Sequence, residues 1–86
     1  MITVALLGGI RKIAGFSTVN INVTDSSINE ILALLERDYN LENKIKESEI
    51  MIAINGVESS VLGGRGARIS SGDTVTILSV VHGGWL

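Results

Sequence analysis

The sequence predicts an α+β fold: a mixed sheet of four to five strands with one main helix packed across one face. Three observations support this prediction. Apolar residues alternate in stretches near both ends of the chain, one central stretch has helical periodicity, and a short apolar run ends at an Asn-Gly turn. The chain has 86 residues, 45% of them hydrophobic and 19% charged, which is typical of one small compact domain.

The first two apolar stretches predict an opening hairpin. They cover residues 1–7 and 18–23, and three glycines interrupt the pattern between them. The apolar face of each strand consists of alternate residues: Ile2, Val4 and Leu6 in the first, and Val19, Ile21 and Val23 in the second.

Residues 28–39 predict the main helix. Ser27 and Glu30 have the spacing of a capping box, in which the serine hydroxyl accepts a hydrogen bond from an early backbone N–H. One face with helical spacing points to the core and consists of Ile28, Ile31, Leu32, Leu35 and Tyr39. We expect the helix to end near Asn40. A short second helix or an irregular turn should follow from Leu41 to Ile45.

The remaining strands lie in the second half of the chain. Residues 50–54 form an apolar run before Asn55-Gly56, a dipeptide that tolerates the positive φ angles of tight hairpin turns. Residues 57–69 predict a brief strand and a Gly-rich connection, and residues 74–81 alternate as a last strand. With the first and last strands parallel at the centre of the sheet, this order of elements is the β-grasp fold.

Composition excludes several classes of function. The chain has no cysteine and its one imidazole is His82, so we expect no disulfide, no thiolate nucleophile and no metal site. The net charge of −2 argues against a nucleic-acid partner. No apolar run reaches the roughly 18 residues that cross a bilayer, and the first residues do not resemble a secretory signal. We therefore expect no membrane partner and a cytoplasmic location.

The candidate site lies at the end of the chain. We expect a β-grasp domain over residues 1–81 and a flexible tail over residues 82–86, which contains Gly83 and Gly84. The motifs LLGGIRKIAG, IAINGV and ISSGDTVTILSVVHGG resemble the ubiquitin-like sulfur carriers of the MoaD/ThiS family. The resemblance covers nearly the whole chain and is closest to the small subunit of molybdopterin synthase (MoaD). The thiamine-pathway carrier ThiS is a shorter relative.

This resemblance implies a chemical role for the tail. In the family, the carboxylate of the last glycine, here Gly84, attacks the α-phosphate of ATP-Mg inside a ubiquitin-activating-type adenylyltransferase. Sulfur then replaces AMP to give a thiocarboxylate. Gly83 and Gly84 suit a narrow channel because glycine has no side chain, and His82 would position the tail or simply be exposed. The resemblance implies no cofactor bound to this chain and no autonomous active site. The implied acceptor of the sulfur is the large subunit of molybdopterin synthase.

Trp85 and Leu86 depart from the family pattern, in which the active form ends at the second glycine. While they remain, Gly84 has a peptide bond in place of the carboxylate that attacks ATP. We therefore expect a peptidase to remove Trp85-Leu86 from a precursor. The alternative is a frayed end on a fold that has lost this chemistry.

A partner-binding surface is predicted on the open face of the sheet. Leu78 and Val80 should point away from the helix, with Leu7 and Met51 beside them. Exposed apolar patches on small domains are typical of binding surfaces. The alternative is that the Gly-rich connection covers these side chains.

Two other functions fit the same features. One is a protein modifier that is conjugated to lysine amines through Gly84, and the other is a degenerate binding module. The fold, tail and activation step are the same for a modifier and a sulfur carrier, so the sequence does not separate these two.

Overall fold

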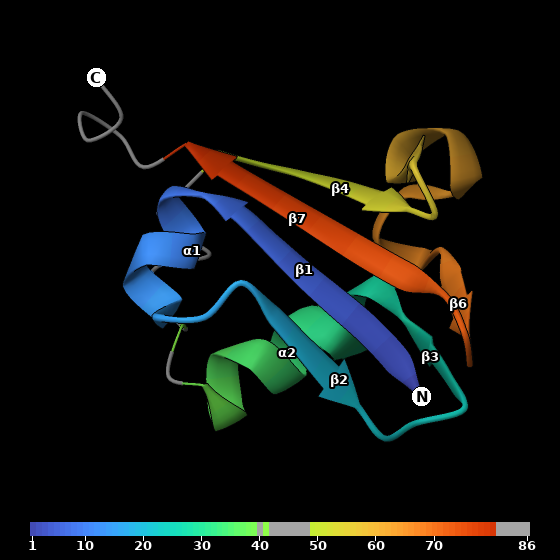
Figure 1. Ribbon diagram of the computed structural model, residues 1–86. Helices are drawn as coiled ribbons and strands as arrows, with labels where there is room; N and C mark the ends of the chain where they lie inside the picture. Colours follow the sequence, from blue (N-terminus) through green and yellow to red (C-terminus); the bar gives the residue numbers. More distant parts are fainter. Residues whose placement is uncertain (40, 42–48, 81–86) are drawn as a thin grey trace.

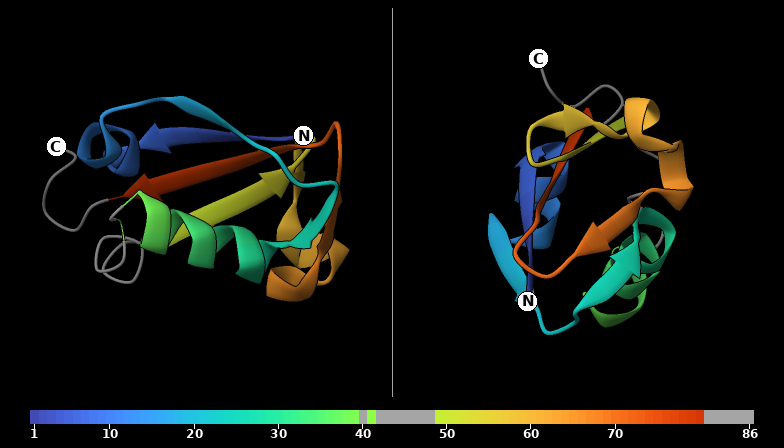
Figure 2. Two further views of the ribbon diagram at one scale, coloured as in Figure 1. Left: turned by 90° about the horizontal axis from the view of Figure 1, so that it is seen from below. Right: turned by 90° about the vertical axis from the view of Figure 1, so that its right-hand side faces the viewer.

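The computed structural model describes residues 1–39, 41 and 49–80. A five-stranded mixed sheet in the order β2-β1-β7-β4-β5 forms one layer, and helix α2 (Ile28–Asp38) forms the other (Figures 1 and 2). The strands of this sheet are β1 (Ile2–Gly8), β2 (Thr18–Ile21), β4 (Glu49–Ile54), β5 (Val57–Glu58) and β7 (Thr74–Val80). The predicted α+β class, with a β-grasp sheet and one main helix, is confirmed.

The two ends of the sequence meet at the centre of the sheet. β1 and β7 are parallel, and their register runs from Thr3 opposite Thr74 to Gly8 opposite Ser79. β2 pairs with β1 and β4 pairs with β7, both antiparallel. A parallel pair requires a long crossover connection, and here that connection contains α2 and β4 (Figure 1). Both predictions for these strands, the opening hairpin and the central parallel pair, are confirmed.

The core lies between the sheet and α2. Alternate residues of β1 and β7 are buried on this side, as their period of two requires. They meet four of the five residues of the predicted apolar face of the helix; the fifth, Tyr39, lies after the end of α2 and is exposed. The buried apolar residues of the three elements are Ile2, Val4, Leu6, Val75, Ile77, Ile28, Ile31, Leu32 and Leu35.

The start of α2 confirms the predicted Ser27 cap, although Glu30 reaches back to the Ser27 hydroxyl and not to the backbone N–H of a full capping box. The backbone N–H of Glu30 donates to the Ser27 hydroxyl oxygen at 3.2 Å, and that hydroxyl donates to the Glu30 carboxylate at 3.1 Å. The helix ends at Asp38, and the Tyr39 ring lies 5.2 Å from that of Phe16, measured between centroids. The cap and this aromatic contact fix both ends of the helix.

Several details differ from the sequence prediction. The segment between β1 and β2 contains a short helix, α1 (Gly9–Ala14), and β2 ends at Ile21, so Val23 lies beyond it. The Gly-rich connection folds into two 3₁₀ turns, η1 (Ser59–Leu62) and η2 (Gly64–Gly66). It then forms β6 (Arg68–Ser70), which pairs with β3 (Asp25–Ser27) in a second small sheet. These elements are too short to show a period in the sequence.

The Asn55-Gly56 turn has positive φ angles of 51° and 83°, as predicted for a tight hairpin. Of the predicted second helix or turn only Leu41 is described, and its side chain is buried. The rest of that segment and the tail, residues 82–86, fall outside the described residues.

Candidate functional site

Three apolar side chains form a line across the open face of the sheet. Leu7 of β1 lies opposite Leu78 of β7, and Leu78 lies opposite Met51 of β4. Their exposed fractions are 44%, 40% and 59%. We call these three residues the apolar row. Their exposure agrees with the predicted open surface and not with the alternative that the Gly-rich connection covers them.

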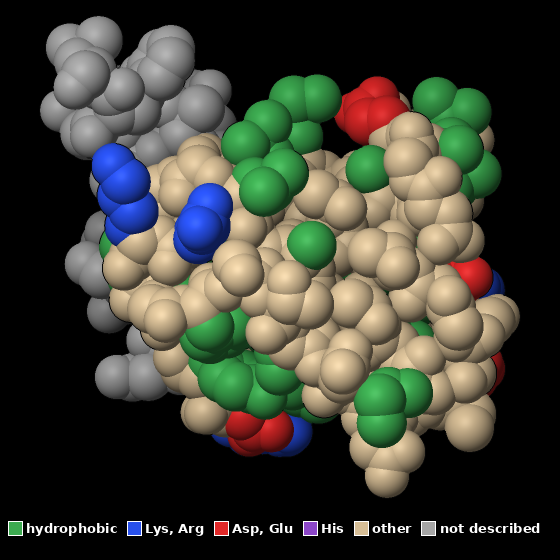
Figure 3. All heavy atoms as spheres, in the orientation of Figure 1, with side chains coloured by type: hydrophobic (Ala, Val, Ile, Leu, Met, Phe, Trp, Pro, Cys, Tyr) green, Lys and Arg blue, Asp and Glu red, His purple; other side chains and the backbone are tan. Residues whose placement is uncertain are grey.

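The apolar row lies near the carboxyl end of β7, where residues 81–86 continue the chain. Figure 3 shows apolar side chains gathered over this part of the face. Toward the opposite end of β7 the same face carries Thr3, Thr74 and Thr76, which are short and polar. The most apolar part of the face is therefore next to the start of the predicted tail. Val80 pairs with Glu49 through its backbone, and its side chain lies outside the description.

A buried hydrogen bond connects the end of β7 to the start of α1. The backbone N–H of Ile10 donates to the Ser79 hydroxyl oxygen at 2.6 Å. Ser79 is buried, on the core side of β7. The bond supplies an acceptor to one of the first N–H groups of α1, which have none within the helix. It also holds the carboxyl end of β7, which precedes the tail, against the start of α1.

Gly8 makes this close packing possible. Its φ is +76°, and a Cβ atom built on it would lie 2.2 Å from the Ser79 carbonyl oxygen. Only glycine fits both the positive φ and the approach of the two backbones. This pair of residues was not predicted from the sequence. A signal existed in the LLGG motif and in the polar Ser79 at a buried position of an alternating strand.

Positive charge accompanies the apolar row. Arg11 and Lys12 lie in the last turn of α1, both are exposed, and Figure 3 shows blue side chains beside the apolar surface. The face next to the tail thus combines an apolar surface with cationic groups.

The described residues provide no metal centre and no membrane-spanning helix. No group of three His, Cys, Asp or Glu side chains in residues 1–39, 41 and 49–80 could hold a metal ion. No helix in this part of the chain is long and apolar enough to cross a membrane. The predicted tail residues His82, Gly83 and Gly84 lie outside the described residues, and their roles stay predictions.

Comparison with solved structures finds the same fold in several proteins. A chain of the BexX/CysO complex from Amycolatopsis orientalis is 25% identical, with a TM-score of 0.74 over 98% of this chain and 100% of that one. Urm1 from Trypanosoma brucei is 24% identical, with a TM-score of 0.77 over 96% of this chain and 94% of its own. Small archaeal modifier protein 1 (SAMP1) from Methanosarcina acetivorans is 24% identical, with a TM-score of 0.75 over 96% and 95%. No curated protein matches significantly.

A protein-family model extends these similarities to the sequence. The model of the ThiS family matches residues 4–84, from the first strand to the second glycine of the tail. Trp85 and Leu86 lie outside the match. This chain therefore belongs to the ThiS family of ubiquitin-like, ThiS/MoaD-type sulfur carriers.

Proposed function

We propose that this chain carries sulfur as a thiocarboxylate on Gly84 and delivers it to the large subunit of a molybdopterin synthase. The observation that carries the proposal is the family match, which spans residues 4–84 and stops at Gly84. The length of the chain and the segment around residues 40–49 favour the molybdopterin branch over the shorter thiamine carriers.

The chemistry proceeds in two transfers. A carboxylate oxygen of Gly84 attacks the α-phosphorus of ATP, and pyrophosphate leaves. The product is an acyl-adenylate, in which AMP is bonded to the carbonyl carbon of Gly84. A sulfide equivalent, supplied by a sulfur donor, then attacks that carbon, and AMP leaves with the P–O bond intact. The product is a thiocarboxylate. Forming a covalent activated intermediate divides the sulfur transfer into two easier steps. ATP and Mg²⁺ are held by the activating partner.

The tail must first be released. Trp85 and Leu86 block the carboxylate of Gly84 by a peptide bond, so a peptidase has to cleave after Gly84 before adenylation. The family match supports this position for the cut because it ends there.

The apolar row provides the contact with the adenylyltransferase and with the synthase subunit. Leu7, Leu78 and Met51 are exposed at the end of the sheet that precedes the tail, so a partner bound there receives the tail directly. Arg11 and Lys12 add long-range attraction to an acidic partner surface. The structure of the BexX/CysO complex supports binding of this kind, because a chain of that complex shares this fold.

Adenylation of a shortened chain tests the proposal. Three forms, ending at Leu86, Gly84 and Gly83, are incubated with ATP, Mg²⁺ and the purified adenylyltransferase of the same organism. We expect pyrophosphate release only from the form ending at Gly84. After addition of a sulfide donor, intact-mass spectrometry should show exchange of one oxygen for one sulfur. Absence of pyrophosphate release from the Gly84 form would overturn the proposal.

The name of one structural neighbour, small archaeal modifier protein 1, favours a second function, conjugation to proteins. The same acyl-adenylate would then be attacked by a lysine amine of a target to form an isopeptide bond. Cells that express a tagged form ending at Gly84 should show higher-mass bands that persist in denaturant and contain this bond. A thiocarboxylate without such bands would favour the sulfur carrier.

A further inference from the structure

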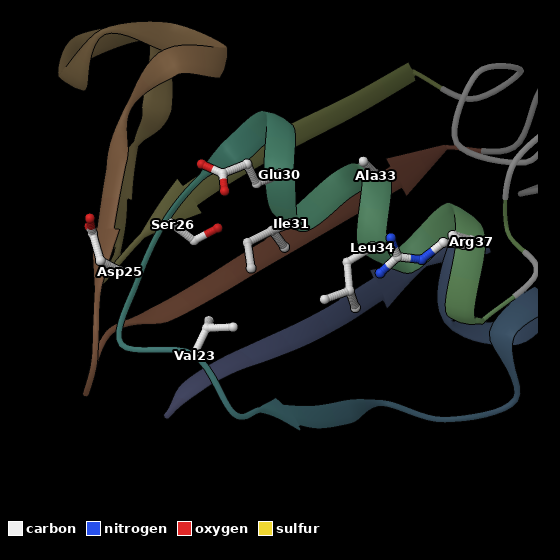
Figure 4. Close-up of a pocket in the computed structure, with 8 residues that line it drawn as sticks. All are labelled: Val23, Asp25, Ser26, Glu30, Ile31, Ala33, Leu34 and Arg37. Atoms are coloured by element: carbon white, nitrogen blue, oxygen red, sulfur yellow. The ribbon is translucent and has the colours of Figure 1, made fainter.

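A groove lies at the edge of the sheet, between α2 and the segment that leaves β2. It has a volume of about 320 Å³. Figure 4 shows Val23 and Leu34 facing one another across it, with Ile31 between them. Arg37 lies at one end of the groove, and Asp25 and Glu30 lie at the other. We call it the α2 groove.

The apolar lining continues along β2. Val19 and Phe16, like Val23 and Leu34, are only partly buried while packing on the core. A strip of incompletely covered apolar side chains therefore runs beside β2 for the length of α2. Incomplete burial on both the strand and the helix leaves room for further side chains above the strip.

β2 is also an edge strand whose outer side can pair. It is the last strand in the sheet order, and β1 is its one partner among the described strands. The Leu6 N–H donates to the Ser17 carbonyl at 2.8 Å, which sets the alternation of the antiparallel pair. By that alternation, the backbone groups of Thr18 and Asn20 point away from β1. An edge of this kind is a template for another strand.

The two ends of the α2 groove differ in the charged residues that they carry. The Arg37 guanidinium is paired with Asp38 at 2.8 Å, but this pair is exposed and stabilises little, so the guanidinium is available to another acid. At the other end, Asp25 and Glu30 contact Arg68 at 2.7 and 3.5 Å and present two carboxylates for that one guanidinium. The Arg37–Asp38 pair is neutral, whereas Asp25, Glu30 and Arg68 together carry one net negative charge, so an acidic residue is more favourable at the Arg37 end than at the Asp25 end.

We propose that β2 and the α2 groove bind an extended segment of another protein. The segment pairs with the backbone of Thr18 and Asn20 as an additional strand and places alternate apolar side chains over the groove. An acidic residue of the segment lies at the Arg37 end. A second copy of this chain does not fit as the occupant, because β2 has four residues and pairing two such edges buries far less than the roughly 1,000 Å² that a stable interface needs.

This surface is distinct from the one in the proposed sulfur transfer. Its residues lie on α2, β2 and the segment after β2, whereas the apolar row lies on the open face of the sheet. The test below uses neither ATP nor an adenylyltransferase, so its result does not depend on the carrier chemistry.

A library of random linear peptides displayed on phage, selected against the full chain, tests the proposal. We expect the selected peptides to share apolar residues at alternate positions and an acidic residue at one end. Synthetic copies should bind in calorimetry, and Leu34→Lys should weaken binding at least about tenfold. Leu78→Asp, on the open face of the sheet, is the matched control and should leave binding of the peptides unchanged.

Two further variants separate docking from folding. Thr18→Pro removes an N–H that points away from β1, so the β1–β2 ladder keeps its bonds while the added strand loses one. Arg37→Glu should weaken binding of the selected peptides, and a peptide with lysine in place of its acid should recover it. The proposal is wrong if no peptide is enriched, or if the enriched peptides bind the Leu34→Lys and Thr18→Pro variants like the original chain. Dimers that Thr18→Pro abolishes would show that a second copy is the occupant, which also overturns it.

Discussion

Gly8 is the residue at which the structure tolerates a side chain least. An added Cβ would lie 2.2 Å from the Ser79 carbonyl oxygen, and the φ of +76° is unfavourable for other residues. We expect Gly8→Ala to lower the free energy of unfolding by about 2–4 kcal/mol, from steric overlap added to backbone strain. Urea denaturation followed by circular dichroism measures this loss.

Gly15 provides the matched control for Gly8. Its φ is +82°, close to that of Gly8, but an added Cβ would have no atom within 4 Å. Gly15→Ala should therefore cost only the strain, about 1 kcal/mol. Equal losses for the two variants would show that the contact between Gly8 and β7 is less close than described.

Ser79 tests the hydrogen bond at the same junction. Ser79→Ala leaves the buried N–H of Ile10 without its acceptor at 2.6 Å, which should cost about 1–3 kcal/mol. Ser26 is a second buried serine, but its hydroxyl reaches a carbonyl only at 3.5 Å. Ser26→Ala should cost less than about 1 kcal/mol because that contact is too long for a strong bond. Faster hydrogen exchange at the Ile10 amide in Ser79→Ala alone would locate the effect.

Among the elements, the turn before β7 is held by a polar network. Asp73 accepts hydrogen bonds from the Ser70 N–H at 2.8 Å and from the Asn55 side-chain amide at 2.9 Å. The Oδ1 oxygen of the same Asn55 side chain accepts from the Thr74 N–H at 2.9 Å. This network joins the β4–β5 hairpin to the turn between β6 and β7.

The network predicts a pH dependence. The Ser70 N–H, and then the Asn55 amide, hold the pKa of Asp73 below its ordinary value of 3.8. A carboxyl whose pKa is lower in the folded state stabilises the fold above the unfolded pKa, and this contribution is lost as the pH falls through the folded pKa. Asp73→Asn should therefore reduce the loss of stability on acidification below about pH 4. Urea denaturation from pH 6 to pH 2.5 compares the two chains, and parallel curves would contradict the assignment.

Elements could be predicted from the sequence where a periodic apolar pattern continues over many residues or where a clear helix cap is present. α2 has four buried residues at helical spacing and the Ser27 cap, and β7 alternates over its whole length. α1 could not be predicted because it has six residues and only Ile10 among them is buried. β3 and β6 have three residues each, and they form only because distant parts of the chain meet.

In the candidate site, too, features with a local sequence pattern could be predicted, and those that depend on distant contacts could not. Alternation in β1 and β7, combined with the parallel register, is sufficient to place Leu7 and Leu78 together on the open face. The hydrogen bond between Ser79 and Ile10 joins residues 69 positions apart. No local pattern contains such a contact, because it depends on how closely β1 and β7 approach at Gly8.

At the scale of the whole molecule, the two proposed surfaces lie on different sides of one small domain. The apolar row lies on the open face of the sheet, and α2 covers the other face (Figure 2). The α2 groove lies between α2 and the edge of the sheet (Figure 4). The domain between them has a closely packed core, so a substitution on one surface should not reach the other. The chain could therefore bind an activating partner and an extended segment at the same time.

Substitutions in the two surfaces should separate binding of the adenylyltransferase from binding of the selected peptides. Leu78→Asp places a charge in the apolar row and should weaken binding to the adenylyltransferase at least about tenfold, because that carboxylate would be buried without a partner. Val80→Asp is expected to act in the same way. The selected peptides should still bind Leu78→Asp, whereas Leu34→Lys should show the opposite pattern. Val61→Asp is the matched control for an exposed apolar residue: its side chain is 75% exposed on η1, and neither binding activity should change.

Calorimetry with both partners measures the separation, and circular dichroism confirms that each variant is folded. Unchanged binding of the adenylyltransferase to Leu78→Asp would remove the apolar row from the proposed carrier mechanism. Loss of both activities in a folded Leu78→Asp chain would show that the two surfaces are coupled through the core. Independent losses would show that the apolar row and the α2 groove bind their partners separately.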